Sequence, residues 1–326
     1  RMYTDLFIER NEMKEFKNGE KVVAVFKNWE DKRDSPSGTI IKSLGKPGES
    51  ETEIHAILHD YGLPYEFPKE IEKAADQIKV SIDSKEIKKR KDFRSTLTFT
   101  IDPISAKDFD DALSFKILNN GLYEVGIHIA DVSHYVQPNT LLDKEAYDRA
   151  TSVYLVDRVV PMLPEVLSNG LCSLRPQEDK LTFSAVFNIN EEGEVTNEWY
   201  GKTIINSDLR FSYEEVQYMI ENNISSVDKK TSLSGKEYTV NPSVFNAITT
   251  LNKQAKKLRL KRINNGAISF DRVEVNFRLD SKNKPESVFF KTSKDANKLI
   301  EEFMLLANKR VAGYIGKKQP KKTFIY

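Results

Sequence analysis

Four aspartates, Asp102, Asp108, Asp110 and Asp111, lie within the short stretch TIDPISAKDFDDAL. They follow the apolar run LTFTI, which is typical of a buried strand, although Asp is disfavoured in strands and an uncompensated buried charge is costly. The carboxylates therefore need solvent, basic partners or cations. Mg²⁺ takes oxygen ligands and usually binds one or two carboxylates together with waters and substrate phosphates. The cluster predicts a site for one or two Mg²⁺ ions that serves phosphoryl chemistry.

An acidic surface loop is the main alternative for these residues taken alone. The apolar segments on either side, LTFTI and ALSF, favour a site over a surface. An EF-hand would need a Gly and a Glu at loop positions where neither stands. Zinc would require His or Cys, and the stretch contains neither. A glycosidase would need only two carboxylates, at a separation that a sequence does not show.

The segments around the cluster predict a mixed α/β domain. TLTFTID and LYEVGIHIADV are typical of strands, and LTFSAVFNINEEGEVTNEWYGKTII of a hairpin that turns at Glu-Glu-Gly. Apolar residues at helical spacing predict helices over 243–262 and 295–316, and a second hairpin lies between them, in GAISFDRVEVNFRLDSKNKPESVFFKT.

The first 60 residues predict short strands separated by turns. LFIER, KVVAVFKNW and SGTIIKSLG are rich in Val, Ile and Phe, with Pro, Gly, Ser and Asp between them. They indicate part of a small barrel, with too few strands to close it. The segment LPYEFPKEIEKAADQI follows and predicts a helix.

Composition sets broad limits. A chain of 326 residues with 39% hydrophobic and 30% charged residues suits a soluble protein of two domains, or of one large domain with an appendage. No apolar run approaches the ~18 residues of a membrane span. The single cysteine, Cys172, excludes an internal disulfide, fits a reducing compartment, and is predicted to be a buried thiol rather than a nucleophile. The net charge of +1 says nothing about nucleic acid, although three basic clusters could follow a polyanion: KEIKKRK, KQAKKLRLKR and GKKQPKK.

The stretch TIDPISAKDFDDAL, followed by VGIHIADVSHYV and RATSVYLVDRVVPMLPEVLSNGLCSL, resembles the catalytic (RNB) domain of the ribonuclease II/R family. The resemblance continues through RFSYEEV, NNGAISFDR and KLIEEFMLLANKRVA, and is closer to the ribonuclease R members. YTDLFI, KVVAVFKNW and GTIIKSLG look like the latter part of the cold-shock barrel that precedes that domain. The resemblance therefore implies an α+β, mixed α/β RNB domain over 93–326, a helical linker over 63–92, and part of an all-β OB-type barrel over 1–62.

This resemblance implies a Mg²⁺-dependent, processive 3′→5′ exoribonuclease that acts on the 3′ end of single-stranded RNA and releases nucleoside 5′-monophosphates. The family's four acidic residues, which organise the metal ions, map onto Asp102, Asp108, Asp110 and Asp111. Among them Asp110 occupies the position whose loss most specifically removes catalysis. We further expect a cytoplasmic monomer without membrane association.

Three aromatic residues acquire roles through the resemblance. A tyrosine that orients the RNA end falls on Tyr154, and two aromatics that clamp the terminal bases fall on Tyr213 and Phe270. By pattern alone, Tyr154 would be a strand core residue, Tyr213 would pack the start of a helix, and Phe270 would belong to a hairpin core. Asp131, in HIADV, is either a partner behind the site or a turn residue at a strand end.

Two glutamates near the end of the chain, Glu301 and Glu302, are predicted to lie on a solvated helix face. The chain opens with Arg1 rather than Met and lacks the family's Ser-Pro-Ile-Arg segment, whose arginine contacts the scissile phosphate. We therefore expect a fragment, with little activity by itself. The competing hypotheses are an RNA-binding regulator that keeps the RNB fold without catalysis, which the intact aspartates argue against, and an unrelated metal phosphoesterase, which the long PMLPEVLSNGLCSL match argues against.

Overall fold

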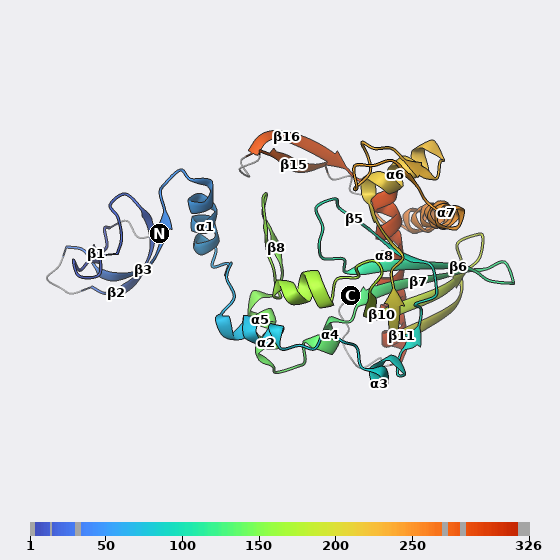
Figure 1. The fold of residues 1–326 in the computed structure, drawn as a ribbon, viewed down its shortest axis with the longest axis horizontal. Helices are drawn as coiled ribbons and strands as arrows, with labels where there is room; N and C mark the ends of the chain where they lie inside the picture. Colours follow the sequence, from blue (N-terminus) through green and yellow to red (C-terminus); the bar gives the residue numbers. More distant parts are fainter. Residues whose placement is uncertain (1–3, 14, 30–33, 269–272, 281–284, 319–326) are drawn as a thin grey trace. The chain divides into compact units, whose positions relative to one another are not determined.

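The structure is a computed structural model that describes residues 4–13, 15–29, 34–268, 273–280 and 285–318. The chain divides into two compact units, each described by itself below (Figure 1). The first unit comprises residues 1–69, 146–162 and 277–287, and the second comprises residues 70–145, 163–276 and 288–326. Within the described part of the chain, no helix has both the length and the apolar character required to cross a bilayer.

The first unit contains a three-stranded sheet in the order β1-β3-β2. Its strands are β1 (Phe7–Ile8), β2 (Lys21–Asn28) and β3 (Ser37–Gly45), and helix α1 (Ser50–Asp60) follows them. The three predicted strand segments are confirmed, whereas the prediction of strands and turns alone is wrong for α1. Helix α1 packs through Leu58, which is fully buried, and through Thr52, whose hydroxyl donates to the Leu44 carbonyl at 2.9 Å.

Residues 146–162 belong to the same unit and form the short hairpin β8 (Val153–Tyr154) and β9 (Val159–Val160). Arg149 donates to the carbonyls of Pro64 at 2.7 Å and Glu66 at 2.8 Å. Arg158 donates to both carboxylate oxygens of Glu51, at 2.9 and 2.6 Å. The hairpin that carries Tyr154 is therefore tied to the segments that follow the three-stranded sheet.

The second unit is built on a seven-stranded mixed sheet in the order β12-β5-β6-β7-β10-β11-β4. Strands β12 and β4 pair in parallel with β5 and β11, and the other pairs are antiparallel. The bounds are β4 (Lys91–Asp92), β5 (Thr98–Asp102), β6 (Asp111–Ile117), β7 (Tyr123–Ala130), β10 (Asp179–Ile189), β11 (Val195–Asn206) and β12 (Leu209–Ser212).

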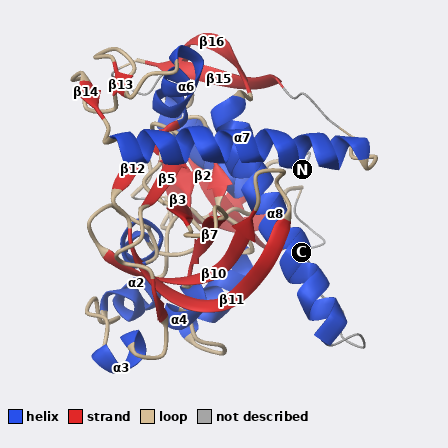
Figure 2. Ribbon diagram, turned by 90° about the vertical axis from the view of Figure 1, so that its right-hand side faces the viewer, coloured by secondary structure: helices blue, strands red, loops and turns tan. Residues whose placement is uncertain are grey.

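Three helices, α6, α7 and α8, pack on this sheet, and Figure 2 shows α7 and α8 crossing one another beside it. Their bounds are α6 (Tyr213–Asn222), α7 (Pro242–Asn264) and α8 (Asp295–Lys318), which confirms the two predicted long helices. Both predicted hairpins also form, the second as β15 (Val273–Leu279) and β16 (Pro285–Thr292). The remaining elements are α2 (Lys69–Asp76), α3 (Ser84–Ile87), α4 (Val132–Tyr135), α5 (Leu141–Arg149), the π-helix η1 (Val166–Leu171), β13 (Ser226–Val227) and β14 (Tyr238–Thr239).

Alternation along the strands gives the sheet two different faces. Because successive side chains of a strand point to opposite sides, Phe99 and Ile101 of β5 share the face that packs against the three helices. The core on that face also contains Leu113, Val125 and Phe187 of the neighbouring strands. The opposite face, here called the polar face, carries buried polar side chains: Thr100, Asp102, Ser114, His128 and Ser184.

His128 occupies the centre of a hydrogen-bonded row on the polar face. Its Nε2 lies 2.9 Å from the Ser114 hydroxyl and its Nδ1 lies 2.7 Å from the Ser184 hydroxyl. The side chain is fully buried, and burial lowers the pKa of His128 to about 3. The ring is therefore neutral in the folded protein at any pH near neutrality.

Acid should therefore destabilise the folded protein partly through His128. A depressed pKa in the folded state means that the stabilisation is present above the unfolded pKa of about 6.5 and is lost as pH falls toward about 3, at up to about 1.4 kcal/mol per pH unit for one proton. We expect the unfolding free energy of His128→Gln to change less steeply with pH between about pH 4 and 6, because about one proton fewer is taken up on unfolding. Urea unfolding at several pH values measures both slopes, and identical slopes would contradict the assignment.

Candidate active site

The four aspartates lie where strands β5 and β6 separate. The two strands pair only at Thr98–Ser114 and Phe99–Leu113, and beyond these pairs the chain leaves the ladder. Asp102 is the last residue of β5 and Asp111 is the first of β6, so Asp108 and Asp110 lie in the irregular connection between them. This connection, residues 103–110, is called the acidic loop below. The strand predicted before the cluster is confirmed, as is its termination at Asp102.

A strand from much later in the chain completes this edge of the sheet. Strand β12 runs parallel to β5, with Ser212 in register with Asp102. Parallel strands end at the same edge, so Tyr213, which opens helix α6, follows β12 at the edge where Asp102 closes β5. Ser212 and Glu215 form a capping box that fixes the start of the helix.

The carboxylates raise one another's pKa values. Burial, followed by the charges of Asp111 and Asp108, raises the pKa of Asp102 to about 7. Burial and the charge of Asp110 raise the pKa of Asp111 to about 6. Partial desolvation and the charge of Asp108 act in the same direction on Asp110, whose side chain is exposed. Such shifts indicate a group of negative charges that the protein itself leaves undercompensated.

The donor set fits a hard cation. Asp102 Oδ2 is buried and has no hydrogen-bond partner among the described residues, which leaves an oxygen available to a ligand. No group of three described His, Cys, Asp or Glu side chains is arranged to hold one ion together. This is compatible with Mg²⁺, because that ion usually takes only one or two protein carboxylates and fills its other positions with waters and substrate phosphates.

Tyr213 lies near two of the aspartates. Burial, followed by the charges of Asp111 and Asp102, raises the pKa of its hydroxyl well above the ordinary value, so these carboxylates lie near it. The same side chain lines a cavity of about 390 Å³ together with Phe290, Lys291 and Lys294. The structure thus brings one of the three predicted aromatics to the aspartates.

The other two aromatics are placed differently. Tyr154 lies in the first unit, at the end of β8. Its side chain is 66% exposed, so the strand core role that pattern alone predicts for it is wrong. Phe270 lies outside the described residues. Their roles in binding RNA stay predictions.

Three further predictions concern residues outside the aspartate cluster. Cys172 is a buried free thiol, as predicted. Glu302 is 3% exposed and accepts hydrogen bonds from Arg262, so the prediction that it lies on a solvated face is wrong, while Glu301 is exposed. Asp131 is also buried, and Arg90 donates to it at 2.7 Å.

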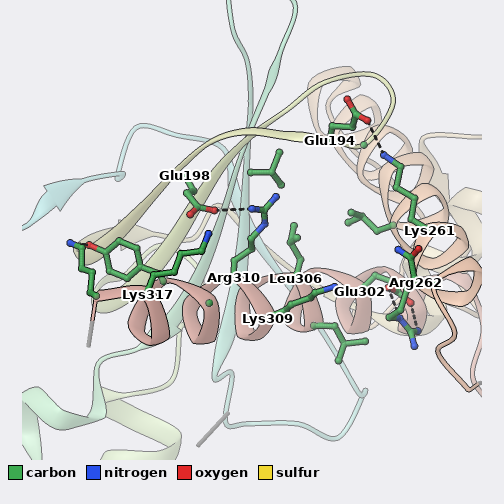
Figure 3. Close-up of a pocket in the computed structure, with 17 residues that line it drawn as sticks. Glu194, Glu198, Lys261, Arg262, Glu302, Leu306, Lys309, Arg310 and Lys317 are labelled. Atoms are coloured by element: carbon green, nitrogen blue, oxygen red, sulfur yellow. Dashed lines mark hydrogen bonds and ion pairs between the residues drawn. The ribbon is translucent and has the colours of Figure 1, made fainter. Parts of the chain in front are cut away.

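A cavity of about 920 Å³ opens elsewhere, between α7, α8 and the start of β11 (Figure 3). Its charged residues largely pair with one another: Arg310 with Glu198 at 3.4 Å, Lys261 with Glu194 at 3.7 Å, and Arg262 with Glu302. The residues that line it include none of the four aspartates or the three predicted aromatics. The aspartate cluster, rather than this cavity, is therefore the candidate active site.

Comparison with known proteins gives the family. The family model described as "RNB domain" matches residues 90–326, and the one described as "Cold shock domain" matches residues 1–68. The chain belongs to the RNB domain family. The RNB match begins before β5 and covers every strand of the seven-stranded sheet, so the aspartate site lies inside the RNB domain.

Relatives and solved structures agree with this family. A DIS3-like exonuclease 2 from Xenopus tropicalis is 40% identical over 301 residues, which are 91% of this chain and 36% of that protein. A structure of Mycoplasma genitalium RNase R in complex with ribose-methylated single-stranded RNA matches with a TM-score of 0.86 at 26% identity, covering 97% of this chain and 48% of that one. Yeast Ssd1, described as a pseudonuclease, shares the fold at a TM-score of 0.66 and 19% identity, covering 96% of this chain and 38% of that one. The chain thus spans about a third of the length of the DIS3-like relative.

Proposed function

We propose that this RNB chain is part of a Mg²⁺-dependent, processive 3′→5′ exoribonuclease that removes nucleoside 5′-monophosphates from single-stranded RNA. The observation that carries the proposal is the position of the four aspartates, from the last residue of β5 through the acidic loop to the first residue of β6, in a chain of this family. In the reaction, water attacks the terminal phosphodiester, the bond from phosphorus to the 3′ oxygen breaks, and that oxygen takes a proton to become the new 3′ hydroxyl.

The four aspartates have different roles in this reaction. Asp102 and Asp111, together with Asp108 and Asp110, would hold Mg²⁺, which when bound polarises the phosphate and activates water. The undercompensated negative charge at Asp102 and Asp111 favours a cation there over a neutral ligand. Asp110, exposed on the acidic loop, is the residue we assign most directly to the reacting water.

Aromatic side chains would stack on the bases without recognising which base is present. Tyr213 opens onto a cavity in which Lys291 and Lys294 pair with Glu214 and Glu221, each at 3.0 Å, so the ring is the feature there that suits a nucleotide base. Stacking contributes about 1–3 kcal/mol per base and accepts any base, so degradation need not depend on sequence. The resemblance assigns roles at the RNA end to Tyr154 and Phe270 as well. The lone buried thiol of Cys172 fits a cytoplasmic, reducing location.

The direction of cleavage is the direct test. Single-stranded RNAs blocked at the 3′ end or at the 5′ end should be compared with the full-length protein in Mg²⁺ and in a chelator. We expect only the 5′-blocked RNA to be shortened, only with Mg²⁺, and nucleoside 5′-monophosphates to be the product on chromatography. Degradation of the 3′-blocked RNA from its 5′ end, or internal cleavage, would contradict the proposal.

The second candidate is an RNA-binding protein without catalysis, favoured by the fold shared with the Ssd1 pseudonuclease. The same assay separates the two, because such a protein would bind both RNAs and shorten neither. The complete aspartate set is the feature that places catalysis first.

A further inference from the structure

The acidic loop has no regular structure of its own. It leaves the ladder after Asp102 and returns at Asp111, where the Asp110 carbonyl accepts from the Ala130 amide of β7 at 3.0 Å. Buried or half-buried main-chain groups need hydrogen bonds from elsewhere, or the loop would be free to move. The Ala106 amide donates to Pro103 at 3.0 Å and forms one local turn. The other partners come from distant parts of the chain.

One arginine gathers the first half of the loop. The Nη2 atom of Arg210 lies 3.1 Å from the Pro103 carbonyl oxygen, 2.9 Å from that of Ile104 and 3.3 Å from that of Ala106. Its guanidinium carbon also lies 4.8 Å from the centre of the Phe109 ring, which is buried within the second half of the loop. A single side chain therefore contacts both halves.

The second half is fixed by a buried serine. The Ser173 hydroxyl donates to the Lys107 carbonyl at 2.8 Å and accepts from the Phe109 amide at 3.0 Å. The Phe109 carbonyl in turn accepts from the Leu174 amide at 2.8 Å. These bonds fix Phe109. Through its contact with the Phe109 ring, Arg210 connects this second half of the loop to the first half, which contains the Ala106–Pro103 turn.

Arg210 is well placed to transmit this order to the site. It lies on β12 in register with Thr100, two residues before Asp102 on the neighbouring strand. Tyr213 follows three residues later on the same segment. The strand that carries Tyr213 to the site thus also holds the loop that carries Asp108 and Asp110.

We propose that Arg210 is the positioning residue of the acidic loop: it holds the carbonyls of residues 103–106 so that Asp108 and Asp110 are presented together with Asp102 and Asp111. Arg210 acts on Asp108 and Asp110 through the loop, its positive charge also acts on the Asp102 carboxylate, and it need not touch RNA. The fixed, planar set of donors in a guanidinium suits several carbonyls and a ring face at once, whereas a lysine offers a flexible point charge that cannot stack. The expected loss of catalysis rests on the proposed function, whereas the expected loss of order in the acidic loop does not.

The test uses Arg210→Met and Arg210→Lys in the full-length protein, with Arg94→Met as the matched control. Arg94 also bridges separate segments of the second unit, through Asp92 and Asp179, but makes no contact with the acidic loop. Amide hydrogen exchange over residues 103–110 without metal reports the order of the loop. Calorimetry with Mn²⁺ alone reports the metal affinity, and RNA shortening gives kcat and KM.

We expect Arg210→Met to speed exchange over 103–110 and to weaken Mn²⁺ binding by about 10–100-fold, with kcat falling more than KM rises. Arg210→Lys should recover part of the protection of residues 103–110 from amide exchange, because it keeps the charge. Arg94→Met should match the parent in amide exchange, in Mn²⁺ affinity and in the kinetics of RNA shortening. Parental exchange and Mn²⁺ affinity in Arg210→Met would overturn the inference. If Arg210→Met does not fold, Arg210→Lys decides: faster exchange confined to 103–110 supports the inference, and parental exchange refutes it. A parent protein that shortens no RNA would refute the proposed function instead, while the exchange result would still decide the role of Arg210.

Discussion

Asp110→Asn in the full-length protein should abolish RNA shortening while leaving RNA binding largely unchanged. The substitution keeps the shape of the side chain but removes a charge from the undercompensated group, so the site loses cation binding and activation of water. A loss of several kcal/mol of transition-state stabilisation corresponds to a fall in kcat of about 10³-fold or more. RNA affinity depends mainly on phosphate and base contacts, which this carboxylate does not provide.

Single-turnover cleavage and filter binding on the same labelled RNA separate the two effects. Asp76→Asn is the matched control, since it makes the same chemical change at an exposed position at the end of α2 and should leave both quantities at the parental level. Cleavage by Asp110→Asn at the parental rate would show that the site has been assigned wrongly.

Arg90→Met should be the most damaging of the stability changes considered for the second unit. The Arg90 side chain is fully buried and donates to the Asp131 carboxylate at 2.7 Å and to the carbonyls of Thr182 and Thr203 on neighbouring strands, at 3.2 and 3.4 Å. Burial acts to raise the pKa of Asp131, but hydrogen bonds from Ser133 and Arg90 outweigh it, so the pKa lies below its usual value. Removing the arginine leaves this carboxylate buried and poorly compensated, at a cost of about 3–5 kcal/mol.

A double-mutant cycle with Asp131→Asn measures the pairing directly. We expect Arg90→Met combined with Asp131→Asn to be less destabilising than the sum of the two single changes, by about 1–3 kcal/mol in urea unfolding. Purely additive effects would argue against a stabilising ion pair. Below the melting temperature, kcat of Arg90→Met should remain near the parental value, which would favour a structural role for Asp131 over a role behind the site.

Local sequence patterns predict much of this fold because the responsible signals are short in range. The run LTFTI shows β5 and its termination at Asp102, and apolar residues at helical spacing show α7 and α8. Helix α1 is missed because its apolar residues are few and only Leu58 among them is buried. Glu302 stands three residues after Leu299 and next to Phe303, so helical spacing alone places it on the side of α8 that faces the core.

The partners of the site are harder to predict because they are distant in sequence. The aspartates form a recognisable motif, but Arg210 is separated from the three loop carbonyls that it contacts by 104 to 107 positions, and Ser173 from Lys107 by 66. Neither has a pattern of its own, and Arg210 within RFSYEEV is indistinguishable from a solvated strand residue. Only the pairing of β12 with β5 reveals what it holds.

The parallel pairing of β12 with β5 also bears on how the site comes into existence. Bringing Ser212 next to Asp102 closes a loop of about 110 residues, and closing a loop of that length has an entropic cost that only the completed sheet and its helices repay. A peptide that contains only the four aspartates, or a chain that still lacks β12, therefore has the carboxylates but does not hold them in the arrangement of the folded site. Because β12 is an edge strand, its local detachment would disperse the site while the rest of the sheet stays folded. Catalytic competence therefore depends on the pairing of one edge strand, β12, with β5.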